Sequence, residues 1–141
     1  MTEPQEAIVE EFGMLDGNLE LILDYLMDLG QRMPDFPETE RTDANLVRGC
    51  QSKVWLYIRQ ENDKVRLTGD SNTAITKGLV SLLVRVFDNR TPAEILDTRI
   101  TFPERIGMDR FIGTQCSNGF SAMIQHIRNT ARAIGLITHN P

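Results

Sequence analysis

The residues best placed to do chemistry lie in a short stretch, 46–56, that carries one of the chain's two cysteines. Its outer parts, Leu46-Val47 and Val54-Trp55-Leu56, are rich in the β-branched and aromatic residues that favour strands. Gly49 lets the backbone turn back sharply, so we expect a tight hairpin with Cys50 near its tip. Nucleophilic side chains are often presented in this way, on a loop carried by a rigid scaffold.

Cys50 can be interpreted in two ways. Many cysteines are small, buried hydrophobic residues without any reactivity. The neighbours of Cys50 are polar instead, namely Arg48, Gln51, Ser52 and Lys53. This polar setting favours a reactive thiol.

The same stretch resembles a known family. Residues 47–56, Val-Arg-Gly-Cys-Gln-Ser-Lys-Val-Trp-Leu, are similar to the signature of the SufE family, the sulfur-acceptor proteins of cysteine desulfurases. Four further blocks match family motifs in order: 29–34 (Leu-Gly-Gln-Arg-Met-Pro), 69–72 (Gly-Asp-Ser-Asn), 75–79 (Ile-Thr-Lys-Gly-Leu), and 117–120 (Ser-Asn-Gly-Phe) with Met123. The resemblance therefore covers nearly the whole chain, and its Gly-Cys-Gln-Ser-x-Val-Trp block is the specific one.

The resemblance implies a sulfur carrier. Cys50 would take persulfide sulfur from a SufS-like cysteine desulfurase, stimulate that enzyme and pass the sulfur to an iron–sulfur scaffold. The protein would be an accessory factor rather than an enzyme, with no cofactor of its own, because the pyridoxal phosphate belongs to the partner. Besides Cys50, we expect the site to be shaped, or the partner bound, by Arg48, Gly49, Gln51, Ser52, Lys53, Asp70, Ser71, Asn72 and Cys116.

Two of these positions depart from the family pattern. Cys116 stands where the family usually has an arginine, and Asn72 stands where it has a second acid. Any role of that arginine as a positive charge is therefore in question here. Cys116 could be a neutral packing replacement, a second stop for sulfur or a resolving thiol.

Two other classes of protein compete with the carrier. A thiol redox protein would use Cys50 as the reactive thiol and Cys116 as the resolving one, although the chain lacks a Cys-x-x-Cys motif. A helical interaction module with an incidental cysteine is the third interpretation, and the expected hairpin argues against it. Cys50, Cys116, His126 and His139 lack zinc-ligand spacing. Two cysteines are also too few for a protein-held iron–sulfur cluster.

Composition limits the remaining possibilities. With 141 residues, 40% of them hydrophobic and 25% charged, the chain is expected to form one soluble domain over 1–141. A net charge of −5 argues against a nucleic-acid partner. No apolar run could cross a membrane, and the N-terminus lacks a signal-peptide pattern. We therefore expect a cytoplasmic protein in which both cysteines are free thiols.

The N-terminal part is expected to be helical. A first helix should cover 3–14, and Asp16 should cap a second helix that ends at Gly30. An apolar stripe along this second segment should face the core; its members are Leu15, Leu19, Ile22, Leu26 and Leu29. A polar, proline-bearing surface connection should follow over 33–45. His126 and Lys77 are expected to be surface residues of later helices.

The central part predicts a small sheet. Three antiparallel strands are expected over 46–49, 53–59 and 64–68, followed by a helix to Phe87 capped by Asp70, Ser71 or Asn72. The strand directions would bring residues 69–72 to the same end of the sheet as Cys50. The positive end of the helix that starts there would lower the pKa of the thiol.

The C-terminal part predicts three more helical segments. Thr91-Pro92-Ala93-Glu94 should start a short helix that ends near Asp97, and 103–113 should hold a short helix and loop. Ser117 or Asn118 should cap a long last helix that ends at Gly135. Helices, then strands, then helices make an α+β fold.

Overall fold

The computed structural model describes residues 3–49 and 52–138, and of residues 114–116 and 137–138 it describes the backbone alone. Its helices are α1 (Pro4–Gly13), α2 (Leu19–Gln31), α3 (Ala74–Phe87), α4 (Pro92–Asp97), α5 (Phe102–Arg105) and α6 (Thr114–Thr138). Its strands are β1 (Val54–Glu61) and β2 (Lys64–Ser71), and short 3₁₀ turns cover Glu38–Glu40, Asp43–Asn45 and Met108–Arg110. The predicted α+β class is confirmed.

The sheet is a single antiparallel hairpin of β1 and β2. Its register runs from Val54 opposite Ser71 to Glu61 opposite Lys64. The prediction of a third strand over 46–49 is wrong for the described residues. There Leu46 forms only an isolated bridge with Trp55, and the N–H of Val47 donates to the carbonyl of Val54 at 2.8 Å.

The short pairing of this segment has a local cause. Gly49 has a φ of +95°, which turns the chain away from the line of a strand. At the same place the segment meets α6, since a Cβ on Gly49 would lie 3.3 Å from the Cβ of Ala122. The chain thus leaves the sheet after two residues and passes onto the helix.

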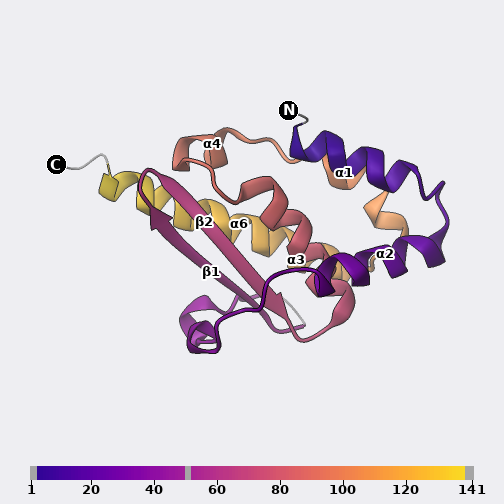
Figure 1. The fold of residues 1–141 in the computed structure, drawn as a ribbon, viewed down its shortest axis with the longest axis horizontal. Helices are drawn as coiled ribbons and strands as arrows, with labels where there is room; N and C mark the ends of the chain where they lie inside the picture. The colour runs from indigo at the N-terminus through magenta and orange to yellow at the C-terminus, as the bar shows by residue number, and fades with distance from the viewer. Residues whose placement is uncertain (1–2, 50–51, 139–141) are drawn as a thin grey trace.

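Helix α3 forms the centre of the core. It lies behind the hairpin together with α6, while α1 and α2 flank it at one side (Figure 1). Most of its surface is covered, because residues on every side of it are buried: Leu79, Val80, Leu82, Leu83, Val86 and Phe87. A Cβ on Gly78 would lie 2.2 Å from the carbonyl oxygen of Leu26, so α2 and α3 are in backbone contact. Gly78 therefore serves the close packing of these two helices.

The predicted start of α2 needs correction. Asn18, rather than Asp16, is the N-cap, and its Oδ1 accepts from the N–H of Leu21 at 3.1 Å. The predicted apolar stripe is fully buried only at Ile22 and Leu26, whereas the side chain of Leu19 is half exposed. Leu19 opens the first turn of α2, which lies at the edge of the molecule (Figure 1).

The later helix starts are partly as predicted. Thr91 and Glu94 form a reciprocal capping box at α4, as expected. Helix α6 begins at Thr114 rather than after a cap at Ser117 or Asn118, and it continues past Gly135 to Thr138. Gly135 is not among the glycines with positive φ, so it does not form the left-handed turn with which a glycine stops a helix. Within the described residues, no helix is both long and apolar enough to cross a membrane.

Candidate functional site

The open end of the hairpin, where β1 begins and β2 ends, holds the chain on the C-terminal side of Cys50. The Oδ1 of Asn72 accepts from the N–H of Lys53 at 3.0 Å, and the N–H of Asn72 donates to the carbonyl of Lys53 at 3.2 Å. The hydroxyl of Ser71 donates to the same carbonyl at 2.8 Å. Lys53 is therefore fixed to the end of β2 by three hydrogen bonds.

Ser52 connects this end to the start of α3. Its hydroxyl accepts from Thr73 Oγ1 at 3.0 Å and lies 3.5 Å from Thr76 Oγ1. Thr73 is the N-cap position of α3, where no side chain caps the helix. The prediction that Asp70, Ser71 or Asn72 caps this helix is therefore wrong, because β2 extends to Ser71 and Asn72 bonds to Lys53 instead.

Residues 69–72 were predicted to lie at the same end of the sheet as the loop that carries Cys50. This is confirmed for the residues that directly follow that loop. Asn72 and Thr73 contact Lys53 and Ser52, which follow the loop directly. Cys50 and Gln51 themselves lie outside the described residues.

The N-terminal side of the loop rests against α6. Val47 is buried and Arg48 is exposed. A groove of about 460 Å³ runs between them and α6, and its remaining lining residues are Asp43, Ala44, Leu46, Ala122, Gln125, His126 and Asn129. Gly49 and Arg48 thus lie where the chain before Cys50 meets α6, and their role in shaping the site stays a prediction.

His126 is a residue of this region that sequence reasoning assigned to the surface. It is partly buried in the groove that Arg48 also lines, and this burial lowers the pKa of its imidazole below the ordinary value of 6.5. Its burial could not be predicted from the sequence, because the other wall of the groove is the distant segment 43–48.

A buried charge cluster lies beneath the same end of the hairpin. The carboxylate of Asp70 is only 8% exposed, with Arg41 Nη1 2.5 Å from its Oδ2 and Lys77 Nζ 3.4 Å from its Oδ1. The guanidinium of Arg41 also lies over the rings of Phe36 and Trp55, 5.4 and 5.2 Å from their centroids.

The cluster holds Arg41 in its charged form. Burial lowers the pKa of Arg41, but the carboxylates of Glu38 and Asp70, which accept its hydrogen bonds, raise that pKa overall. The 33–45 segment was expected to be a solvated connection, yet through Arg41 it is anchored to the sheet. Lys77, expected on the helix surface, contributes the second cation.

The structure does not place the Cys116 thiol relative to this site, because only the backbone of Cys116 is described. Its backbone lies in the first turn of α6, and its side chain is not among those described. Among the residues that the structure does describe, no group of three or more His, Cys, Asp or Glu side chains could hold a metal ion.

Comparison with known proteins bears on this arrangement. A family model described as SufE, Fe-S metabolism associated domain, matches residues 6–131. The chain belongs to the SufE family. The match includes the whole of the hairpin end described above. By the description of its family, this SufE domain is associated with iron–sulfur metabolism.

A solved structure supports the fold of this SufE domain. It is described as the solution structure of a hypothetical protein from Thermus thermophilus. The TM-score is 0.75 at 21% sequence identity, and the alignment covers 94% of this chain and 97% of the other. At that identity the likeness concerns the fold.

Proposed function

We propose that this SufE-family protein accepts persulfide sulfur on Cys50 from a cysteine desulfurase, stimulates that enzyme and passes the sulfur on to iron–sulfur cluster assembly. The observation that carries the proposal is the fixing of the chain on both sides of Cys50. Lys53 is hydrogen-bonded to the residues at the end of β2, and Gly49 packs on α6. The described residues on either side of Cys50 are therefore already in place when a partner approaches.

The chemical step needs only a thiolate and access to the partner. The Cys50 thiolate attacks the outer sulfur of the partner's cysteine persulfide, so that a new sulfur–sulfur bond forms on Cys50. The old sulfur–sulfur bond breaks, and the partner's cysteine leaves as a thiolate. The transferred sulfur keeps its oxidation state, the Cys50 sulfur is oxidised and the partner's cysteine sulfur is reduced by the same amount, so no external oxidant is consumed.

The surroundings of the loop favour that thiolate. Arg48 and Lys53 are exposed cations next to it in sequence, and among the described residues neither has an ion-pair partner. The start of α3 contributes free N–H groups close to Ser52. Cations and helix N-termini both lower the pKa of a cysteine, so we expect Cys50 to be ionised at neutral pH more readily than a free cysteine.

The test is intact-mass analysis after incubation with a cysteine desulfurase and cysteine. Wild type and Cys116→Ser should gain the mass of one or more sulfur atoms, whereas Cys50→Ser should gain none. Cys116→Ser is the matched control, because it removes the chain's other thiol. The fold of Cys50→Ser is checked by its unfolding curve.

Other outcomes would contradict the proposal. Full stimulation of the desulfurase by Cys50→Ser would show that Cys50 is not the acceptor. Sulfur on Cys116 alone would move the site to α6. Loss of two hydrogens under mild oxidation, with a Cys50–Cys116 disulfide in the peptide map and no sulfur uptake, would favour the thiol redox protein instead.

A further inference from the structure

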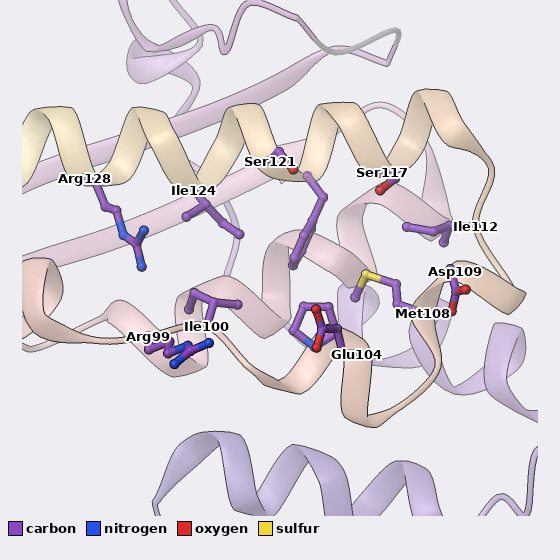
Figure 2. Close-up of a pocket in the computed structure, with 12 residues that line it drawn as sticks. Arg99, Ile100, Glu104, Met108, Asp109, Ile112, Ser117, Ser121, Ile124 and Arg128 are labelled. Atoms are coloured by element: carbon purple, nitrogen blue, oxygen red, sulfur yellow. The ribbon is translucent and has the colours of Figure 1, made fainter.

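A second cleft lies on the other side of the core, between α6 and the segment 99–112. It has a volume of about 660 Å³, within the range of small-molecule sites. Figure 2 shows Arg128 reaching from α6 toward the opposite wall, where Arg99 and Ile100 lie, with Asp109 and Ser117 at the far end. None of the residues that flank Cys50 lines this cleft.

Arg128 is held in place at one end of the cleft by the backbone. Arg128 Nη2 donates to the carbonyl of Thr98 at 2.6 Å, which fixes the guanidinium. The Nε of Arg128 is buried and has no hydrogen-bond acceptor among the described residues. Because this nitrogen has almost no accessible surface, a ligand in the cleft would meet the outer part of the guanidinium instead.

Neither arginine of the cleft, Arg99 or Arg128, forms an ion pair with a carboxylate among the described residues. Arg85 and Arg105, in contrast, each form close ion pairs elsewhere. An anion at this end would therefore gain charge-assisted hydrogen bonds.

The rest of the lining selects the kind of anion. The walls are largely apolar, contributed by Ile100, Pro103, Met108, Ile112, Phe120 and Ile124. Glu104 and Asp109 also line the cleft, so its two cations are balanced by two carboxylates. This balance disfavours a phosphate or another multiply charged anion, and the apolar walls favour a ligand with a hydrocarbon body.

We infer that this cleft binds a small monocarboxylate with an apolar body. Its carboxylate pairs with the guanidinium groups of Arg99 and Arg128, while its hydrocarbon part lies against Ile100 and Ile124. This inference does not depend on the role of Cys50.

The probe is octanoate, titrated into the ¹⁵N-labelled full chain and followed by amide chemical shifts. Saturable shifts are expected within 98–112 and 117–128. Arg128→Gln should weaken binding at least about tenfold, the effect of losing a hydrogen bond to a charged group. Arg132→Gln is the matched control, because Arg132 lies one turn further along α6, is exposed and, among the described residues, hydrogen-bonds to Asn129 at 3.4 Å without lining the cleft. It should bind octanoate as the wild type does.

A second variant keeps the test decisive if Arg128→Gln fails to fold. Ser121→Phe adds bulk at an exposed position on the cleft wall without removing a described hydrogen bond, and it should also weaken binding. Octylamine and inorganic phosphate should bind more weakly than octanoate. Equal binding of octanoate and octylamine, unchanged affinity in both cleft variants, or no saturation at millimolar octanoate would each overturn the inference.

Discussion

Arg41 shows how one side chain connects a loop to the site. It comes from the 33–45 connection, yet its guanidinium contacts the buried carboxylate of Asp70 and lies over the ring of Trp55. Asp70 and Trp55 are directly opposite each other in the hairpin. The chain that leads into the cysteine loop is therefore attached to the same end of the sheet as the chain that leaves it.

We predict that Arg41→Gln lowers the free energy of unfolding by about 1–3 kcal/mol, because it leaves a buried carboxylate short of a charged partner. Arg59→Gln is the control. Arg59 also lies over an aromatic ring, that of Tyr57, but its carboxylate partner Glu61 is half exposed. Its loss should change stability by no more than about 1 kcal/mol. Urea unfolding of both variants measures the difference, and equal losses would mean that the Asp70 contact contributes nothing special.

Asn72 gives a second prediction at the scale of one residue. Its Oδ1 accepts from the N–H of Lys53, three residues after Cys50. Asn72→Asp keeps that acceptor and adds a negative charge, which should raise the pKa of the Cys50 thiol by at most about one unit at a solvated site. Rates of iodoacetamide alkylation over a pH series measure this pKa, because the thiolate is the reacting form. Superimposable curves for the two proteins would mean that residue 72 is too far from the thiol for its charge to matter.

At the scale of elements, α3 and the hairpin were predictable because their signals are local. The β-branched and aromatic residues of 54–56 indicated β1, and the helix predicted up to Phe87 matches the end of α3. The third strand failed because Gly49, with a φ of +95°, turns the chain out of the sheet and onto Ala122 of α6 after only two paired residues. The caps at Asp70 and Ser71 failed for a similar reason, since β2 continues through both residues to pair with β1.

The contact between α2 and α3 depends on glycine. Gly78→Ala should lower the free energy of unfolding by about 1–3 kcal/mol, because the new Cβ would meet the backbone of Leu26 and force the helices apart. Gly13→Ala is the matched control: Gly13 ends α1, and a Cβ there has nothing within 4 Å. That substitution should be neutral or stabilising by up to about 1 kcal/mol. Thermal unfolding compares the two, and a neutral Gly78→Ala would show that α2 and α3 can separate at little cost.

At the scale of the whole molecule, the two faces of α6 meet different chemistry. One face contacts Gly49 and lines the groove shared by Arg48 and His126, and another lines the cleft that contains Arg128. Between these two faces, the apolar side chains of Met123 and Ile127 are buried. The sequence could not predict which polar residues of the helix are covered, because that depends on loops that are distant in the chain.

Stability should therefore depend on pH through His126. Burial lowers its pKa in the folded protein, while the unfolded chain keeps the ordinary value of about 6.5. Between these two values the unfolded state binds more protons, so the free energy of unfolding falls as the pH is lowered from about 7 toward 5. Glu11 does not interfere in this window, because its hydrogen bonds from Arg85 lower its pKa below 4.5.

Urea unfolding at several pH values tests this dependence with two histidine variants. His126→Gln should flatten the profile between about pH 7 and 5, because it removes the titrating group whose burial differs between the folded and unfolded states. His139→Gln removes the chain's other histidine and should leave the slope as in the wild type. If the wild-type profile is already flat, or if His139→Gln rather than His126→Gln removes the slope, then the imidazole of His126 is not shielded from water in the groove beside Arg48.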